Sequence, residues 1–318
     1  MANIAIVNYC NLKCPYCFAD DMIKEENSFM SLEQYNKLLD FILKDPGSRV
    51  GILGGEPTLH PNLIDILKIT SEKCENKRAI MFTNGIELEK FLPYLKDIRV
   101  LINYNNPNNL TDIQLDKLHK TMEAVKELDW FSPNQVAVGC NIYLGCSNYD
   151  YIWDVVSKYS LKLIRCSVVS PGGIYTKWKN KKDEYFDLLK PIYINFCKEA
   201  LKHDCKLEMD CSHIPFCCFT EEEKALVNEV SLHKKECEGF CPCALDFTID
   251  SKATACFGVY EPIDYSKFTN PKSLTYYLVS KQMKPLTKLN NTGKCATCEQ
   301  HVNGSCQGGC LAFANRPE

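Results

Sequence analysis

The chain has 318 residues, 45% of them hydrophobic, which is enough for one large domain with an appendage or for two domains. Its net charge of -3 and pI of about 6.1 provide no basic field, so we expect no nucleic-acid partner. A chain of this size does not need its 20 cysteines as disulfide staples.

The first ten residues, MANIAIVNYC, lack a basic segment, and their apolar run is too short for a signal peptide or a membrane span. We therefore expect a cytoplasmic protein with no membrane partner. Because thiols stay reduced in that compartment, clustered cysteines indicate bound metal rather than disulfides.

Apolar runs alternate with helical patterns from the N-terminus to about residue 212. The expected strands are residues 3–8, 49–53, 78–83, 98–104, 135–144 and 161–169. The expected helices are residues 31–43, 60–69, 111–128 and 183–202, the first with a capping box of Ser31 and Gln34 and the last kinked or split at Pro191. Six strand–helix repeats predict an α/β fold, a partial (β/α)6 TIM-type barrel.

After residue 211 this alternation fails, and the chain becomes rich in cysteine and turns. The sequence therefore predicts a core domain of residues 1–212 and a small C-terminal domain of residues 213–318. We expect metal rather than packed side chains to form the core of the second domain.

Three cysteines, Cys10, Cys14 and Cys17, follow the first expected strand in the run CNLKCPYCF. In parallel α/β folds, ligands bind at this end of the strands. A structural zinc ion needs a fourth ligand, and no Cys or His lies between Asp20 and Arg49. A four-iron, four-sulfur cluster held by three thiolates keeps one iron open, so we favour a cluster with an open site over zinc.

The C-x3-C-x2-C run, with Tyr16 before its last cysteine, resembles the motif of the radical S-adenosylmethionine (SAM) superfamily. GGEPTLHP at residues 54–61 resembles the GGEP motif of that family, and TNG at 83–85 ends the third expected strand, as in many members. The resemblance implies a [4Fe-4S] cluster whose open iron binds SAM. Reduction then cleaves SAM to methionine and a 5′-deoxyadenosyl radical, which takes a hydrogen atom from the substrate.

The resemblance also assigns roles in binding SAM. Gly54, Gly55 and Glu56 are expected to bind the methionyl amine, and Tyr16 is expected beside the adenine. Asn103 and Asn141 are expected to contact the ribose or the carboxylate, unless they are ordinary strand-end asparagines that satisfy turns.

The cysteine-rich C-terminal region resembles the SPASM extension of this superfamily, which holds up to two auxiliary [4Fe-4S] clusters. By that resemblance Cys237, Cys243, Cys256 and Cys310 hold the first auxiliary cluster. Cys295, Cys298 and Cys306 supply three ligands of the second. A zinc-ribbon site made of Cys295, Cys298, Cys306 and Cys310 is the alternative.

Two features depart from the SPASM pattern. Ser251 occupies a position where the family generally has Gly, and no cysteine follows Cys310 to complete the second cluster. Either Cys217, Cys218 or Cys241 is the fourth ligand, or one iron stays open, or only one auxiliary cluster forms. Cys217 and Cys218 are also candidate catalytic hydrogen-atom donors. We expect the remaining cysteines to pack as small apolar residues, namely Cys74, Cys140, Cys146, Cys166, Cys197 and Cys205.

The resemblance implies a ribosomally made peptide as substrate, modified by crosslinking, epimerisation or a related reaction. It also implies an external one-electron reductant, such as flavodoxin or ferredoxin, and leader binding by a separate protein or by another surface. Phe257 follows Cys256 where sulfatase-maturing members have Asp, which argues against that activity. The alternatives are a radical SAM enzyme acting on a small molecule and a non-enzymatic iron–sulfur or zinc regulator. The GGEP motif argues against a regulator, since a scaffold has no use for a backbone nest beside an open metal site.

Overall fold

The computed structural model describes residues 1–17, 20, 23, 28–75, 78–129, 132, 135–170, 177–178, 180–210, 213–233 and 239–314. By internal contacts the chain forms two compact units. The first unit is Met1–Cys14, Ala19–Ala137 and Cys243–Gln282, and the second unit is Pro15–Phe18, Val138–Pro242 and Met283–Glu318. The division into domains of residues 1–212 and 213–318 stays a prediction.

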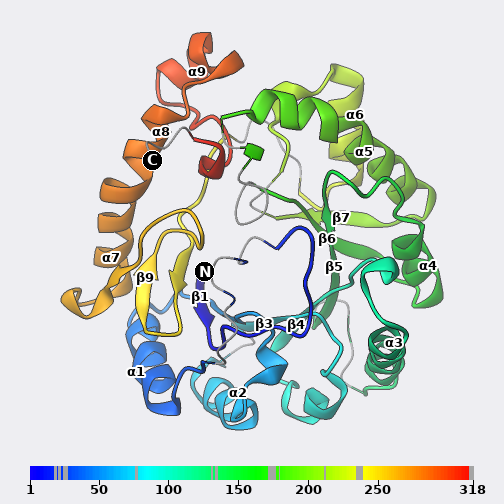
Figure 1. The fold of residues 1–318 in the computed structure, drawn as a ribbon, viewed down its shortest axis with the longest axis vertical. Coiled ribbons are helices and arrows are strands. Elements are labelled where there is room, and N and C mark those ends of the chain that lie inside the picture. The colour runs from blue at the N-terminus through cyan, green and yellow to red at the C-terminus, as the bar shows by residue number, and fades with distance from the viewer. Residues whose placement is uncertain are drawn as a thin grey trace. The chain divides into compact units, whose positions relative to one another are not determined.

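Four parallel strands in chain order form the centre of the first unit (Figure 1). They are β1 (Ala2–Ala5), β2 (Val50–Leu53), β3 (Ala79–Thr83) and β4 (Arg99–Asn103). In the register of this sheet, Ile4 pairs with Ile52, and Ile52 pairs with Met81. All three side chains are fully buried, so an apolar run of this kind forms a strand covered on both faces.

The other side of β1 carries three further strands, all from the C-terminal region. They are β8 (Leu245–Phe247), parallel to β1, and the antiparallel strands β9 (Lys252–Thr254) and β10 (Ile263–Asp264). The sequence predicted no strand here, because segments of two or three residues are too short to show a period. Residues 245–264 therefore extend the sheet of the first unit.

Helices cover this sheet, and Figure 1 shows α1 and α2 together on one side of it. The α-helices of the first unit are α1 (Leu32–Leu43), α2 (Leu63–Lys73), α3 (Asp112–Lys126) and α7 (Pro271–Leu278). The predicted capping box of α1 is confirmed, since Ser31 Oγ accepts from Gln34 N and Gln34 Oε1 accepts from Ser31 N. Short 3-10 turns lie at η2 (Pro57–Leu59), η4 (Glu89–Tyr94), η5 (Pro107–Asn109) and η8 (Tyr265–Lys267).

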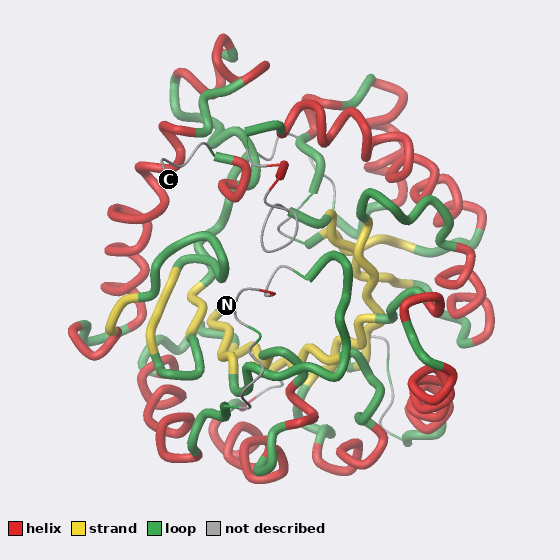
Figure 2. Tube along the Cα trace, viewed as in Figure 1, coloured by secondary structure: helices red, strands yellow, loops and turns green. Residues whose placement is uncertain are grey.

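The second unit contains three parallel strands and the longest helix of the described chain. Its strands are β5 (Val136–Ile142, which begins in the first unit), β6 (Leu163–Val168) and β7 (Lys206–Met209). Its α-helices are α4 (Asp150–Lys158), α5 (Lys182–Lys202), α6 (Glu221–Val230), α8 (Lys284–Leu289) and α9 (Glu299–Val302), drawn red in Figure 2. Because α5 continues through Pro191, the predicted split does not occur.

Four short segments complete the description. A π-helical turn spans Val279–Met283, and 3-10 turns lie at η7 (Phe216–Cys218), η10 (Gly293–Thr297) and η11 (Leu311–Phe313). Phe313 is buried against Tyr185 and Phe186 of α5, with ring centroids 5.3 and 5.0 Å apart. The end of the C-terminal region therefore packs against α5 through apolar side chains, and the metal core stays a prediction.

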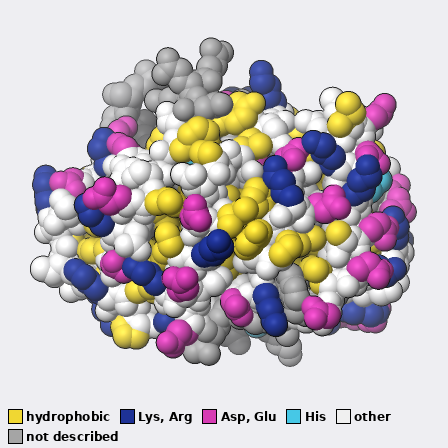
Figure 3. Space-filling view, turned by 90° about the horizontal axis from the view of Figure 1, so that it is seen from below, with side chains coloured by type: hydrophobic (Ala, Val, Ile, Leu, Met, Phe, Trp, Pro, Cys, Tyr) yellow, Lys and Arg dark blue, Asp and Glu magenta, His cyan; other side chains and the backbone are white. Residues whose placement is uncertain are grey.

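The fold class agrees with the prediction, because parallel strands alternate with helices as in a partial TIM-type barrel. No helix in the described ranges is both long and apolar enough to cross a membrane. On the face in Figure 3, Lys and Arg side chains lie among Asp and Glu side chains.

Candidate active site

The two glycines after β2 lie against the chain that leads into Cys10. A Cβ atom on Gly54 would stand 2.4 Å from the Val7 carbonyl oxygen, and one on Gly55 would stand 2.2 Å from the Tyr9 carbonyl oxygen. Two backbone hydrogen bonds close this contact, from Gly55 N to Val7 O and from Glu56 N to Tyr9 O, both 2.9 Å. These N–H groups therefore bind the protein's own backbone, and only glycine permits so close an approach.

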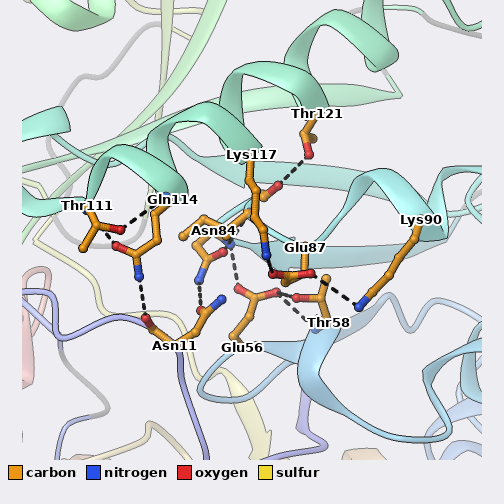
Figure 4. Close-up of polar contacts among 12 residues, drawn as sticks. Asn11, Glu56, Thr58, Asn84, Glu87, Lys90, Thr111, Gln114, Lys117 and Thr121 are labelled. Atoms are coloured by element: carbon orange, nitrogen blue, oxygen red, sulfur yellow. Dashed lines mark hydrogen bonds and ion pairs between the residues drawn. The ribbon is translucent and has the colours of Figure 1, made fainter.

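The carboxylate of Glu56 is buried and accepts four hydrogen bonds (Figure 4). Oε1 accepts from Thr58 N, Thr58 Oγ1 and Thr83 Oγ1, at 3.1, 2.6 and 2.6 Å. Oε2 accepts from Asn84 N alone, at 2.7 Å. Burial raises the pKa of Glu56, while these hydrogen bonds oppose the rise.

None of the four donors to Glu56 carries a charge, so the described residues give this buried carboxylate no cationic partner. A carboxylate oxygen has two lone pairs, and Oε2 uses one of them. A ligand ammonium at Oε2 would add a charge-assisted hydrogen bond and would offset the cost of burying the negative charge.

Asn11, between the first two cysteines of the motif, connects three segments of the first unit. Its Oδ1 accepts from Asn84 Nδ2 at 2.8 Å, and its carbonyl oxygen accepts from Gln114 Nε2 at 3.0 Å (Figure 4). The sequence analysis missed Asn11, Asn84 and Gln114 as supports of the cysteine loop. The position of Asn11 inside the motif was the available signal.

The three motif cysteines are half-buried. Cys14 Sγ donates to Asn105 Oδ1 at 3.3 Å, and Cys10 Sγ accepts from Leu12 N at 3.4 Å. Cys17 belongs to the second unit, as does Tyr16, whose ring centroid lies 4.6 Å from that of Tyr143. Tyr16 is therefore held at an aromatic contact rather than in solvent.

The two predicted strand-end asparagines differ in their contacts. Asn141, in β5, accepts a hydrogen bond from Ser167 Oγ at its Oδ1, 2.6 Å away. Its amide nitrogen is thus the group that it can offer to a ligand oxygen. Asn103 ends β4, and its carbonyl oxygen accepts from Asn105 Nδ2 at 3.1 Å.

The predicted auxiliary ligands are distributed over both units. Cys243 and Cys256 belong to the first unit, whereas Cys295, Cys298, Cys306 and Cys310 belong to the second, and all six are half-buried. Cys237 lies outside the described residues.

Cys217 and Cys218 form a neighbouring pair of thiols in η7. A hydrogen bond from Cys218 lowers the pKa of Cys217 to about 6, and the same pairing raises the pKa of Cys218. Lys190 Nζ donates to the Cys218 carbonyl oxygen at 3.2 Å.

Within the described ranges, no group of three or more Cys, His, Asp or Glu side chains is arranged to hold a metal ion. The predicted ligand sets, including those at Cys10, Cys14 and Cys17, therefore stay predictions. Their donor chemistry still fits iron, because thiolates are the usual ligands of iron–sulfur clusters and these thiols are half-buried. The six cysteines expected to pack as apolar residues are all buried, which confirms that expectation.

A parallel sheet, a close-packed glycine loop after β2, and cysteines spaced C-x3-C-x2-C in the sequence after β1 define an α/β protein with a candidate iron–sulfur site. Residues 4–156 match the family model described as the Radical SAM superfamily. The match covers a little under half of the chain, from β1 into α4.

Two curated relatives match the chain over less than half of its length. The chain is 28% identical to molybdenum cofactor biosynthesis protein 1 of Homo sapiens over 160 residues, 48% of this chain and 25% of that protein. It is 29% identical to a probable GTP 3′,8-cyclase of Methanococcus maripaludis over 150 residues, 44% of this chain and 50% of that protein. The chain thus spans a quarter to a half of the length of these relatives.

Among solved structures, SuiB of Streptococcus suis bound to the precursor peptide SuiA matches 98% of this chain and 71% of its own, at a TM-score of 0.67 and 18% identity. SuiB bound to S-adenosylmethionine matches at a TM-score of 0.64 and 16% identity, over 98% of this chain and 72% of its own. At these identities the likeness shows a common fold.

Proposed function

We propose that this protein is a radical SAM enzyme, which cleaves SAM reductively and removes a hydrogen atom from a substrate. The observation that carries the proposal is the contact between Gly54–Gly55 and residues 7–9, which fixes the backbone directly before Cys10 against the GGEP loop. Both motifs that the superfamily uses for SAM meet in this contact. The family match over residues 4–156 supports the same conclusion.

Cys10, Cys14 and Cys17 would hold a [4Fe-4S] cluster. When bound, the cluster would supply one electron, taken from an external reductant such as flavodoxin or ferredoxin, for the cleavage of SAM and the removal of a substrate hydrogen atom, with methionine and 5′-deoxyadenosine as products. The protein's part is to orient SAM and to exclude water.

The chain's own residues suit the two ends of SAM. Glu56 Oε2, with one hydrogen bond from Asn84 and no cation beside it in the described structure, would accept the methionyl ammonium. Gly54 and Gly55 would place this carboxylate next to the Cys10 segment. The amide nitrogen of Asn141 would donate to a hydroxyl or carboxylate oxygen, because its Oδ1 already accepts from Ser167. Tyr16 would lie beside the adenine, and Asn103 would contact the ribose or the carboxylate.

For the substrate we propose a ribosomally made peptide. The supporting observation is the fold likeness to the SuiB–SuiA complex, which extends over 98% of this chain and so includes the region after residue 212. The sequence matches to the curated relatives cover less than half of the chain. A leader-binding protein is a further proposed partner.

A second candidate is a small-molecule substrate. It is favoured by the 29% identity to a probable GTP 3′,8-cyclase, an enzyme named for a nucleotide substrate. Binding a nucleoside triphosphate needs positive charge near the phosphates, so titration of GTP into the purified protein separates the two candidates.

Auxiliary clusters are proposed in the cysteine-rich region. Cys237, Cys243, Cys256 and Cys310 would hold the first, and Cys295, Cys298 and Cys306 would supply ligands to the second. For its fourth ligand we propose Cys217, since Pro215 of the same segment packs near Gly309, where an added Cβ would lie 3.1 Å from Pro215 Cγ. Burial and the nearby Cys217 both raise the pKa of Cys295.

The test is anaerobic reduction of the reconstituted protein with SAM, followed by measurement of 5′-deoxyadenosine and iron. We expect 5′-deoxyadenosine from the natural protein and about 8 to 12 irons per chain, at four irons per cluster. Changing Cys10, Cys14 and Cys17 together to Ala should abolish 5′-deoxyadenosine and remove about four irons. The matched control is Cys74→Ala and Cys205→Ala, two buried thiols outside the motif. Cleavage that persists in the triple variant would refute the proposal.

A further inference from the structure

Lys182, the first residue of α5, is a buried cation. Only 3% of the residue is exposed to solvent. Its Nζ donates to the Asn290 carbonyl oxygen at 2.9 Å, to Asn290 Oδ1 at 3.3 Å and to the Gly308 carbonyl oxygen at 3.5 Å. All three acceptors are neutral. The three N–H groups of an ammonium are thus satisfied, but its charge is not.

No carboxylate pairs with Lys182 within the described part of the chain. The neighbouring Asp183 accepts from Lys294 N at 2.9 Å instead. Burying a lysine without a negative partner is unfavourable, so a site that retains one usually places an anion beside it. The question is which anion Lys182 faces.

Two thiols of the second unit, both predicted cluster ligands, lie near Lys182. Gly308, whose carbonyl oxygen Lys182 contacts, donates its N–H to Cys306 Sγ at 3.2 Å. Burial raises the pKa of Cys295, and the nearby Lys182 opposes that rise. The lysine therefore lies one residue's backbone away from Cys306 and in the neighbourhood of Cys295.

Asn290 fixes this arrangement. It is fully buried, and its Nδ2 donates to the carbonyl oxygens of Gln307 and Gly308, at 2.9 and 3.1 Å. Gly308 has a φ of +78°, and a Cβ atom there would stand 3.1 Å from Lys182 Nζ. Both the positive φ and the nearby ammonium therefore favour glycine at position 308, in the loop after Cys306.

Close packing also favours glycine at position 239, beside Cys306. A Cβ atom on Gly239 would stand 1.8 Å from Cys306 Sγ, so no other residue type fits there. The loops are held together by Gln307 N and Gly309 N, which donate to the Gly239 carbonyl oxygen at 2.9 and 3.1 Å. A thiol packed against glycine backbone and within reach of a buried cation suits a ligand of a negatively charged metal centre.

We propose that Lys182 is the built-in counter-charge of the second auxiliary cluster, the centre to which Cys295, Cys298 and Cys306 contribute, and that its positive charge raises the reduction potential of that cluster. This inference rests on the proposed function, which supplies the cluster. A [4Fe-4S] centre with thiolate ligands is negative, and reduction adds one further negative charge. A fixed cation at short range in a buried site favours the reduced form, because Coulomb interactions are weakly screened there.

The experiment measures the midpoint potentials of the anaerobically reconstituted protein by redox titration with electron paramagnetic resonance detection. The variants are Lys182→Met, which keeps the length but removes the charge, and Lys182→Arg, which keeps the charge. The control is Lys202→Met on the same helix, where the Lys202 Nζ lies 2.6 Å from a Glu199 carboxylate oxygen and the charge is already paired. Iron content and melting temperature are measured for each variant.

We expect Lys182→Met to decrease the equilibrium constant for one-electron reduction of one auxiliary cluster at least tenfold, a shift of about 59 mV to more negative potential. Lys182→Arg and Lys202→Met should stay within a factor of three of the natural protein. Loss of about four irons from Lys182→Met with retention in Lys182→Arg would also support the role of charge. Unchanged potentials in Lys182→Met at full iron content would overturn the inference, as would equal iron loss in the Met and Arg variants.

A separate pair of variants tells this failure from failure of the proposed function. Cys295→Ala with Cys298→Ala should remove about four irons from the otherwise natural chain. If iron is unchanged, the second auxiliary cluster does not exist, and both proposals are overturned. If iron falls but Lys182→Met leaves every potential unchanged, only the inference about Lys182 is wrong.

Discussion

Thr83 Oγ1 donates a hydrogen bond to Glu56 Oε1 at 2.6 Å, which ties the residue after the GG pair to the last residue of β3. Asn84 N donates to the other oxygen of the same carboxylate at 2.7 Å. One buried side chain therefore connects the GGEP and TNG motifs, which lie 28 residues apart along the chain. The carboxylate holds this turn, and its second task, by our proposal, is to meet the methionyl ammonium.

Glu56→Gln tests the second task. The amide keeps the shape and one acceptor oxygen, but it removes the charge that would attract the methionyl ammonium. We expect SAM affinity to fall by about 1.5–3 kcal/mol, roughly 10- to 150-fold, as for other hydrogen bonds to charged groups. Calorimetric titration of SAM into anaerobic protein measures the change.

The control for this variant is Glu87→Gln. Glu87 contacts Lys117 and Lys90 near the protein surface, in ion pairs that contribute little to stability. We expect its SAM affinity to match that of the natural protein. If Glu56→Gln lowers only the melting temperature and leaves SAM affinity intact, Glu56 has a structural role alone.

Gly55→Ala tests the contact between the GG pair and the cysteine segment. The new Cβ would stand 2.2 Å from the Tyr9 carbonyl oxygen, and backbone cannot move aside as a side-chain tip does. We expect a loss of stability of at least about 2 kcal/mol, with a loss of iron at Cys10, Cys14 and Cys17. Urea unfolding and iron analysis measure the two effects.

Gly47→Ala is the matched control, because its Cβ would meet nothing closer than Asp45 Oδ1 at 3.8 Å. We expect this variant to keep both its stability and its iron. Gly55→Ala protein with natural iron content and stability would show that the chain before Cys10 does not depend on this contact.

The sequence predicted β1, β2, β3 and β4 of the first unit because each is a run of mostly apolar residues. The expected strand 49–53 and the observed Val50–Leu53 differ by one residue. Helix α1 was equally clear, since Ser31 and Gln34 mark its start. In contrast, α4 (Asp150–Lys158) was not predicted, because a helix of 9 residues shows little more than two turns of periodicity.

The sequence predicted residues of the candidate site only where the spacing of a motif indicates its chemistry. Cys10, Cys14 and Cys17 are recognisable from their intervals. Asn11 and Gln114 are not, because their contact joins residues 103 positions apart and depends on the fold. The sequence also led us to interpret the GG pair as a backbone nest for a ligand. In the structure, the N–H groups of Gly55 and Glu56 instead donate to the carbonyl oxygens of Val7 and Tyr9. Lys182 gave no signal, since only tertiary packing buries it.

Asp246 provides a test through pH. Its carboxyl group is buried in the first unit, where Oδ1 accepts from Asn3 Nδ2 at 2.7 Å and Oδ2 from Phe257 N at 3.0 Å. Burial raises its pKa from 3.8 to about 7. The folded protein thus binds this proton more tightly than the unfolded chain, so its contribution to stability is full below pH 3.8 and is lost as the pH rises through about 7.

We expect the natural protein to lose stability relative to Asp246→Asn as the pH rises from 5 toward about 7. Urea unfolding under anaerobic conditions at several pH values between about 5 and 8 measures it. The control Asp264→Asn should show no such trend in this range, because hydrogen bonds from Ser266 lower the pKa of Asp264. A constant difference for Asp246→Asn would mean that this carboxyl stays ionised in the folded protein.

Ser251 departs from the glycine that the SPASM resemblance leads one to expect, and the structure gives that departure a cost. Its φ is +60°, in the left-handed region that disfavours residues with a Cβ atom, and its buried Oγ has no hydrogen-bond partner among the residues that the structure describes. We expect Ser251→Gly to stabilise the protein by about 1 kcal/mol, since relief of the turn and removal of the unpaired hydroxyl together outweigh the greater freedom of glycine in the unfolded chain. Urea unfolding measures the gain.

Ser273→Gly, in the first turn of α7, is the control and should destabilise by about 1 kcal/mol or less. If both substitutions destabilise, the turn between β8 and β9 is held by contacts that tolerate serine, and the glycine of the related proteins reflects some need other than the backbone angle.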